Sequence, residues 1–135
     1  MKSRAVLVDG FWIVVDNGRK HSVAIDLPES LGGTDKGPTA LELAVMGLAG
    51  CVATIFKLVC NKMRIPVESL EVVVEAEKPE GASTVEKAKI VAKVKTSANE
   101  AAVKRAWNTT METCPVGVLF KRANVELKEE LEIVK

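Results

Sequence analysis

The feature that most constrains this chain is an almost unbroken apolar run from Leu43 to Cys60, interrupted only by Gly47, Gly50, Thr54 and Lys57. The segment Thr39-Ala40-Leu41-Glu42 directly before it matches a capping box, in which a threonine and a glutamate three residues later satisfy free backbone N–H groups. We therefore predict a long helix that opens at Thr39. Because a helix that is apolar all round is buried on all sides, we expect it to be covered completely.

A membrane-spanning helix is the alternative interpretation of this run, since its length is close to what a bilayer requires. Glu42 and Lys57 lie inside the stretch Leu41–Cys60, and a charge inside a membrane is costly. We therefore expect a soluble protein with no membrane partner. One sheet from so small a chain covers only one side of the helix, so we predict an obligate homodimer in which a second copy covers the rest.

Strand patterns precede the helix. Ala5–Val8, Phe11–Asp16 and Arg19–Ile25 are rich in apolar, partly β-branched residues, and Asp9-Gly10 and Asn17-Gly18 separate them. These two dipeptides supply the positive φ that two-residue hairpin turns require, so the first part of the chain predicts a β-meander. The stretch from 27 to 37, with Pro28 and a Gly-Gly pair and with Pro38 directly after it, predicts a loop.

Two alternating segments after the helix predict a β-hairpin. Leu70–Ala76 carries glutamates on its polar positions and Ala88–Val94 carries lysines, so opposite charges would pair across the strands. A phosphate-binding stripe of lysines is the alternative, and the adjacent acids favour a charge-paired, solvated face.

The last part of the chain predicts two helices and a strand. Ser97-Ala98-Asn99-Glu100 matches a second capping box, before a helix that ends near Thr113. Pro115 suits the first position of a short helix that runs to about Arg122, and Val125–Val134 predicts a final strand. The order βββ–α–ββ–α–α–β predicts an α+β fold in a single domain, 1–135, distinct from a βαβ nucleotide fold or a thioredoxin fold.

Composition narrows the class of partner and the compartment. The chain has 135 residues, a formal net charge of +1 and few aromatic residues, which gives no basis for nucleic-acid binding. The cysteine count of three is odd, and the opening MKSRAVLVDG lacks the apolar run of a signal peptide. We therefore expect a reducing, cytoplasmic location.

The three cysteines differ in what they can do. Cys51 and Cys60 are nine residues apart on one helix, on opposite faces and about 13 Å apart along the axis, so they cannot pair with each other. Any intramolecular disulfide must therefore use Cys114. Because Cys114 precedes Pro115 at the start of a helix, local physics alone makes Cys114 the more acidic thiol. We interpret Cys60 as a packing residue.

A zinc site is a weak alternative. Cys51, Cys114 and His21 could supply three ligands, but the chain has no C-x₂-C pair and a single histidine, and the spacing matches no structural zinc motif. We predict no metal and no cofactor, and we expect His21 at the surface or at a subunit interface.

The segment GGTDKGPTALEL, residues 32–43, followed by Leu48-Ala49-Gly50-Cys51, resembles the OsmC/Ohr family of osmotically induced protein C and organic hydroperoxide resistance proteins. Cys114-Pro115-Val116 is similar to the second signature of that family, and the element order agrees over essentially the whole chain. The resemblance implies an OsmC-like fold in an intertwined homodimer, with sites at the subunit boundary, and reduction of hydroperoxides, preferably organic ones.

The resemblance also implies roles for four residues. Cys51 would be oxidised to a sulfenic acid and Cys114 would resolve it as a Cys51–Cys114 disulfide. Arg19 would stabilise charge on the peroxide and Glu42 would orient Arg19. An external dithiol would then reduce the disulfide, and resemblance to the Ohr branch implies a lipoyl-type dithiol. Here the resemblance favours Cys51 as the reactive thiolate, against the helix-end argument for Cys114.

The sequence also allows structural roles for these residues and a non-catalytic role for the protein. Glu42 could serve only in the capping box, and Arg19 could be an exposed hairpin residue. The protein as a whole could be a non-catalytic small-ligand-binding or redox-sensing member of the same fold.

Overall fold

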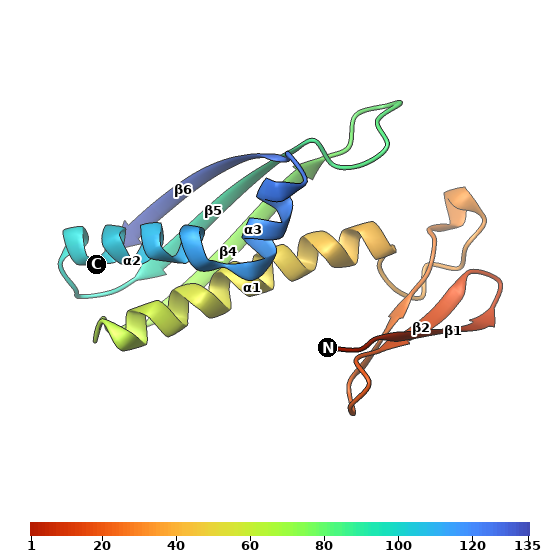
Figure 1. Ribbon diagram of the computed structural model, residues 1–135, viewed down its shortest axis with the longest axis horizontal. Helices are drawn as coiled ribbons and strands as arrows, with labels where there is room; N and C mark the ends of the chain where they lie inside the picture. Colours follow the sequence, from red (N-terminus) through yellow and green to blue (C-terminus); the bar gives the residue numbers. More distant parts are fainter. The chain divides into compact units, whose positions relative to one another are not determined.

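The computed structural model describes every residue from Met1 to Lys135 and has the predicted α+β order (Figure 1). In chain order its elements are β1 (Arg4–Asp9), β2 (Trp12–Asp16), β3 (Ser22–Ile25), a 3₁₀ turn η1 (Glu29–Leu31), α1 (Ala40–Lys62), β4 (Ser69–Glu77), β5 (Lys87–Lys95), α2 (Glu100–Thr113), α3 (Pro115–Arg122) and β6 (Glu126–Val134).

The chain divides into two compact units, Met1–Ala44 and Val45–Lys135. Helix α1 begins in the first unit and continues into the second. The single domain over 1–135 stays a prediction.

The first unit contains the predicted meander, an antiparallel sheet in the order β1-β2-β3. Asp9 pairs with Trp12 across a tight turn, in which Gly10 has a φ of 54°. The second predicted turn is wrong in length, because β3 begins only at Ser22. The side chain of Asn17 accepts the backbone N–H of Arg19 at 3.0 Å, and this local bond builds a five-residue connection from 17 to 21 instead of a two-residue turn.

The predicted loop before α1 is built around a buried carboxylate. Asp26 accepts the Thr34 hydroxyl at 2.7 Å and the backbone N–H groups of Leu27 and Lys36. These hydrogen bonds, that of Thr34 first, hold the pKa of Asp26 below its ordinary value. The loop also approaches β3 so closely that a Cβ on Gly37 would overlap the carbonyl of Ala24, so this position requires glycine.

The second unit is one sheet with helices on one face (Figure 1). The sheet order is β4-β5-β6, with β4 antiparallel and β6 parallel to β5, and the parallel connection is made by α2 and α3. The inward side chains of β5 are fully or almost fully buried. Ile90, Ala92 and Val94 belong to the main core with the helices, and Ala88 packs in a smaller cluster with Val85 and Val125. The main core positions the segments that carry the three cysteines.

The outward face of this sheet carries the predicted charge pairing. Glu71 is in register with Lys93 and Glu75 with Lys89. The ion pair that forms at Lys89, however, is with Glu130 of β6 at 3.0 Å, and it raises the pKa of Lys89.

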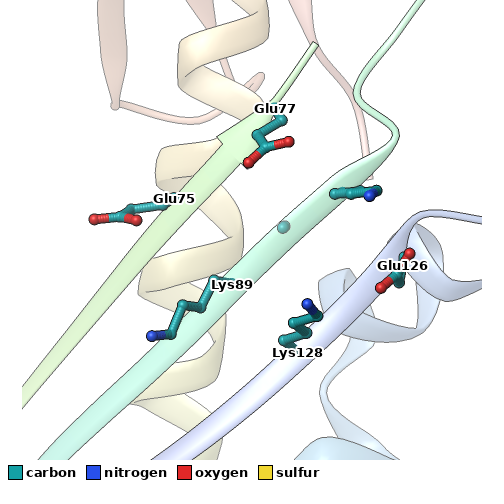
Figure 2. A pocket seen from close by; sticks show the side chains of 7 residues that line it. Glu75, Glu77, Lys89, Glu126 and Lys128 are labelled. Carbon is teal, nitrogen blue, oxygen red and sulfur yellow. The ribbon is translucent and has the colours of Figure 1, made fainter. Parts of the chain in front are cut away.

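A shallow hollow of about 180 Å³ on this face is lined by three glutamates and three lysines besides Ala88. Figure 2 shows two of the glutamates, Glu75 and Glu77, on β4, with Lys89 on β5 and Glu126 and Lys128 on β6. Because the opposite charges are equal in number, the hollow offers no excess charge to an anion such as phosphate.

Helix α1 buries one stripe of residues rather than its whole circumference. The buried residues are four apart, at Leu48, Val52, Phe56 and Cys60, and Phe56 meets Trp107 of α2 edge-on at a centroid distance of 5.6 Å. Met46 and Leu58 are about half exposed, at 55% and 49%. The expectation of burial on all sides is therefore not met within one chain, because one sheet and one neighbouring helix cover a single side.

By length and composition alone, α1 could also cross a membrane. Its most apolar window has a mean hydropathy of 2.1, and 22% of that window is buried. Core helices of soluble proteins meet the same criterion, and the buried stripe of α1 belongs to the core of the second unit. The absence of a membrane partner stays a prediction.

The helix starts test the two predicted capping boxes. The first is confirmed, since Glu42 Oε2 accepts the Thr39 N–H at 2.7 Å and the Thr39 hydroxyl accepts the Glu42 N–H at 3.1 Å. The second is wrong, because the N-cap of α2 is Asn99, whose side chain accepts the backbone N–H groups of Ala101 and Ala102. Asparagine is as good a cap as serine, and it stands directly before the first helical residue.

Candidate active site

Cys51 and Cys114 meet in the second unit, although 63 residues separate them in the chain. Their Sγ atoms are 3.2 Å apart, and the Cys114 thiol donates toward Cys51. Both cysteines are free thiols here, and a further approach of about 1 Å would join them, since a disulfide bond is about 2.05 Å long. The pair is therefore poised for reversible oxidation.

The sharp corner between α2 and α3 places Cys114. A residue before proline is driven out of the helical region, and Cys114 has a φ of −64° and a ψ of 113°. It ends α2, with its N–H on the Thr110 carbonyl at 2.8 Å, and it caps α3, with Sγ accepting the Gly117 N–H at 3.4 Å. The chain thus turns at the one residue that carries the sulfur.

The predicted N-cap position of Cys114 is confirmed, but its predicted acidity is wrong. Cys114 is 0% exposed. Burial raises the pKa of the Cys114 thiol from its ordinary value of 9.0 to about 11, and the Gly117 N–H opposes this rise without cancelling it. Desolvation of a buried thiolate outweighs the attraction of one helix end, so Cys114 stays protonated at neutral pH.

Cys51 has the opposite exposure. It lies in the middle of α1, one residue from the buried Val52, and is itself only half-buried. Of the two paired cysteines, only Cys51 is partly exposed to solvent. The two cysteines therefore differ in their access to solvent.

Cys60 lies away from this chemistry. It is fully buried in the core of the second unit, and burial raises the pKa of its thiol. This environment suits the packing role that the sequence predicts for it.

Arg19 and Glu42 belong to the first unit, whereas both paired cysteines belong to the second. Arg19 lines an open hollow of about 540 Å³ together with three other cationic residues, Lys2, Arg4 and Lys20, and with Asp16 and His21. Glu42 is used in the capping box with Thr39. Within the first unit, Arg19 and Glu42 form no ion pair with each other.

His21 is exposed, with its Nδ1 3.1 Å from the side-chain amide of Asn17. No group of three or more His, Cys, Asp or Glu side chains is arranged to hold a metal ion. Sequence reasoning did not single out Gly117, whose N–H contacts the Cys114 sulfur. The signal was available, because the residue three positions after an N-cap presents a free N–H to it.

The model of the OsmC-like protein family matches residues 33–130, which include both paired cysteines. No curated protein matches the sequence of this chain.

Several solved structures share the fold. An OsmC-like protein from Mycoplasma pneumoniae is 16% identical, with a TM-score of 0.87 over 99% of this chain and 96% of that one. An organic hydroperoxide resistance protein OsmC from Legionella pneumophila is 19% identical, with a TM-score of 0.71 over 97% and 95%. The organic hydroperoxide resistance protein OhrB of Bacillus subtilis is 21% identical, with a TM-score of 0.63 over 98% of each chain.

The family model covers most of the chain, and the similar structures cover nearly all of it. The sequence motifs, the α+β order and the whole-chain match agree. This chain belongs to the OsmC/Ohr family of OsmC-like proteins.

Proposed function

We propose that this protein is a thiol-dependent peroxidase that reduces hydroperoxides, organic hydroperoxides in preference to hydrogen peroxide. The observation that carries the proposal is the 3.2 Å approach of a half-buried sulfur, Cys51, to a fully buried sulfur, Cys114. In this proposal Cys51 reacts with the substrate, and the buried Cys114 reacts afterwards with the oxidised Cys51. The names of the Legionella pneumophila and Bacillus subtilis proteins support the same class of substrate.

The reaction takes place in two steps. The Cys51 thiolate attacks the distal oxygen of the hydroperoxide, the O–O bond breaks, and the products are a Cys51 sulfenic acid and an alcohol, whose oxygen takes up a proton. The Cys114 thiol then attacks the Cys51 sulfur. An S–S bond forms, the S–O bond breaks, and the hydroxyl leaves as water with the proton of Cys114. The substrate supplies the oxidising equivalents.

A dithiol restores the enzyme by thiol–disulfide exchange, and we propose a lipoyl-type dithiol in the reducing cytoplasm. The protein works as a homodimer in this proposal. Support comes from the exposed apolar residues of α1, such as Met46 and Leu58, which a second copy would cover.

The test is consumption of cumene hydroperoxide with dithiothreitol or dihydrolipoamide as reductant. Wild type should turn over, and Cys51→Ala should not. Cys60→Ala is the matched control, because it removes a thiol from the same helix, and it should retain turnover. Cys114→Ala should consume about one equivalent and then lose activity as Cys51 is over-oxidised. Turnover by Cys51→Ala would contradict the proposal.

Arg19 and Glu42 complete the proposed site, with Arg19 stabilising charge on the peroxide and Glu42 orienting it. Arg19→Lys should lower kcat/KM by about tenfold or more, because lysine lacks the planar fork of donors. Arg4→Lys is the control, since Arg4 already pairs with Asp16 at 3.0 Å. Equal activity of the two variants would remove Arg19 from the site.

Glu42→Gln separates the two roles of Glu42. Glutamine still closes a capping box, so the helix start should persist, while the charge that orients Arg19 is lost. We expect a normal circular dichroism spectrum with a kcat/KM lowered by about tenfold. Unchanged kcat/KM would leave Glu42 with the capping role alone.

The second candidate is a non-catalytic OsmC-like protein that senses oxidants. The burial of Cys114 favours this candidate, because a buried sulfur slows the reduction of the disulfide by external thiols. Stoichiometric oxidation of wild type without turnover, in the presence of either dithiol, would identify this case.

A further inference from the structure

Lys121, in the last turn of α3, joins three elements around the Cys114 corner. Its Nζ donates to the Met111 carbonyl in the last turn of α2 at 3.1 Å. The same Nζ forms an ion pair with Glu129 Oε1 of β6 at 3.3 Å. Neither residue is needed to explain the chemistry of the two sulfurs.

The Met111 carbonyl needs such a donor because of Pro115. In a continuous helix, the N–H four residues later would pair with this carbonyl. Residue 115 is a proline and has no N–H. The proline that turns the chain at Cys114 therefore also leaves the Met111 carbonyl without its helical donor. Lys121 supplies the missing donor from the next helix.

Glu129 stands at an unusual position for a charge. Inward positions of β6 alternate along the strand and otherwise carry Leu127, Leu131 and Ile133. Glu129 shares their parity and is in register with Ile90, which is fully buried. The Glu129 side chain is still partly exposed, at 28%, and its carboxylate pairs with Lys121 at the edge of the core.

The spacing connects this contact to the cysteine. Lys121 follows Cys114 by seven residues, about two helical turns, so both lie on the same side of α3. Lys121 reaches back across the corner to α2 and sideways to the sheet. The contacts thus restrain the angle between the two helices at Cys114.

We propose that Lys121 and Glu129 are positioning residues that hold Cys114 in reach of Cys51 for disulfide formation. This inference rests on the proposed two-thiol chemistry. The step it affects is the attack of Cys114 on the Cys51 sulfenic acid, in which the S–S bond forms and water leaves. The earlier attack of Cys51 on the hydroperoxide does not use the corner.

The test compares Lys121→Met and Glu129→Gln with two controls. Glu130→Gln is the matched control, because it makes the same change one residue along, where the carboxylate pairs with Lys89 on the outer face. Lys121→Arg is the conservative control, since arginine keeps the charge and the donors. One equivalent of cumene hydroperoxide is added to reduced protein, and sulfenic acid trapped by dimedone and disulfide are followed by mass spectrometry.

We expect the first two variants to form the disulfide about tenfold more slowly, with a matching rise in trapped sulfenic acid, because small misplacements of reacting groups are costly. The rate of the first step should be unchanged in all variants. Lys121→Arg and Glu130→Gln should behave as wild type. A disulfide rate equal to wild type in both Lys121→Met and Glu129→Gln would overturn the proposal.

Oxidation by diamide separates this inference from the peroxidase proposal. Diamide converts two neighbouring thiols to a disulfide without a hydroperoxide, so it reports the position of Cys114 directly. Slower diamide oxidation in the variants supports the positioning role even if wild type reduces no hydroperoxide. Thermal unfolding checks that each variant is folded; if Lys121→Met is not, Glu129→Gln decides, because it changes only one partly exposed group.

Discussion

At the scale of single residues, Cys114 shows two effects of opposite sign on one thiol. Its place at the start of α3 favours a thiolate, through the Gly117 N–H, and its burial favours the thiol. Burial is the larger effect. The free energy that a thiolate loses on full desolvation exceeds the stabilisation that it gains from one N–H group and from the partial charge at the helix end. The same burial keeps Cys114 away from solvent, whereas Cys51 is only half-buried.

The raised pKa of Cys114 predicts a loss of stability in alkaline solution. The folded-state pKa of about 11 lies above the ordinary value of 9.0, so folding favours the protonated thiol. Its contribution is complete below pH 9 and is lost as the pH rises toward 11, on the order of 3 kcal/mol in total. Urea unfolding of the reduced protein should show this decline between pH 8 and about pH 11.

The matched variant for this measurement is Cys114→Ala. Its stability should be lower at every pH because of the cavity, but its decline with pH should be shallower. Cys60→Ala gives the share of the other buried thiol, whose pKa is raised by burial as well. Parallel curves for wild type and Cys114→Ala would show that Cys114 does not titrate in this way.

At the scale of secondary structure, helix ends were less certain than helix interiors. The pattern from Thr39 and the Cys-Pro pair at 114–115 predicted the starts of α1 and α3 correctly. For α2, both Ser97 and Asn99 are residues that cap helices. The Thr96 hydroxyl accepts the Ala98 N–H at 3.1 Å and organises the chain there, which leaves Asn99 as the cap.

Substitution of the two candidate caps tests this choice. Asn99→Ala should destabilise the protein by about 1 kcal/mol, because two N–H groups of α2 lose their acceptor. Ser97→Ala should change the free energy of unfolding by less than about 0.5 kcal/mol. Denaturant unfolding of both variants measures the difference, and a larger effect at Ser97 would restore the capping box that the sequence predicts.

At the scale of the whole molecule, α1 leaves apolar side chains uncovered. Only its stripe from Leu48 to Cys60 is buried within the chain, while Met46 and Leu58 are exposed. Burial of these exposed apolar side chains against a second copy would remove them from water. It supports the homodimer that the apolar run predicts and that the proposed function uses.

Light scattering after gel filtration tests the dimer. The expected mass is twice the 14.5 kDa of one chain. Met46→Glu and Leu58→Glu should shift the equilibrium toward monomer, because each places a charge on the uncovered face. Lys104→Glu on α2, whose only ion pair is with the exposed Glu100, is the control and should leave the mass unchanged. A wild-type mass of one chain at micromolar concentration would contradict the dimer.

The sequence by itself determined the order of elements, the long apolar helix, the confirmed cap at Thr39 and the restriction of any intramolecular disulfide to Cys114. These depend on local spacing, turn residues and chain geometry, which a few neighbours decide. Only the tertiary structure decided that the two sulfurs are 3.2 Å apart, that burial raises the pKa of Cys114, and that Lys121 replaces the N–H that Pro115 lacks. Desolvation and long-range contacts depend on residues far apart in the chain, so no local pattern encodes them.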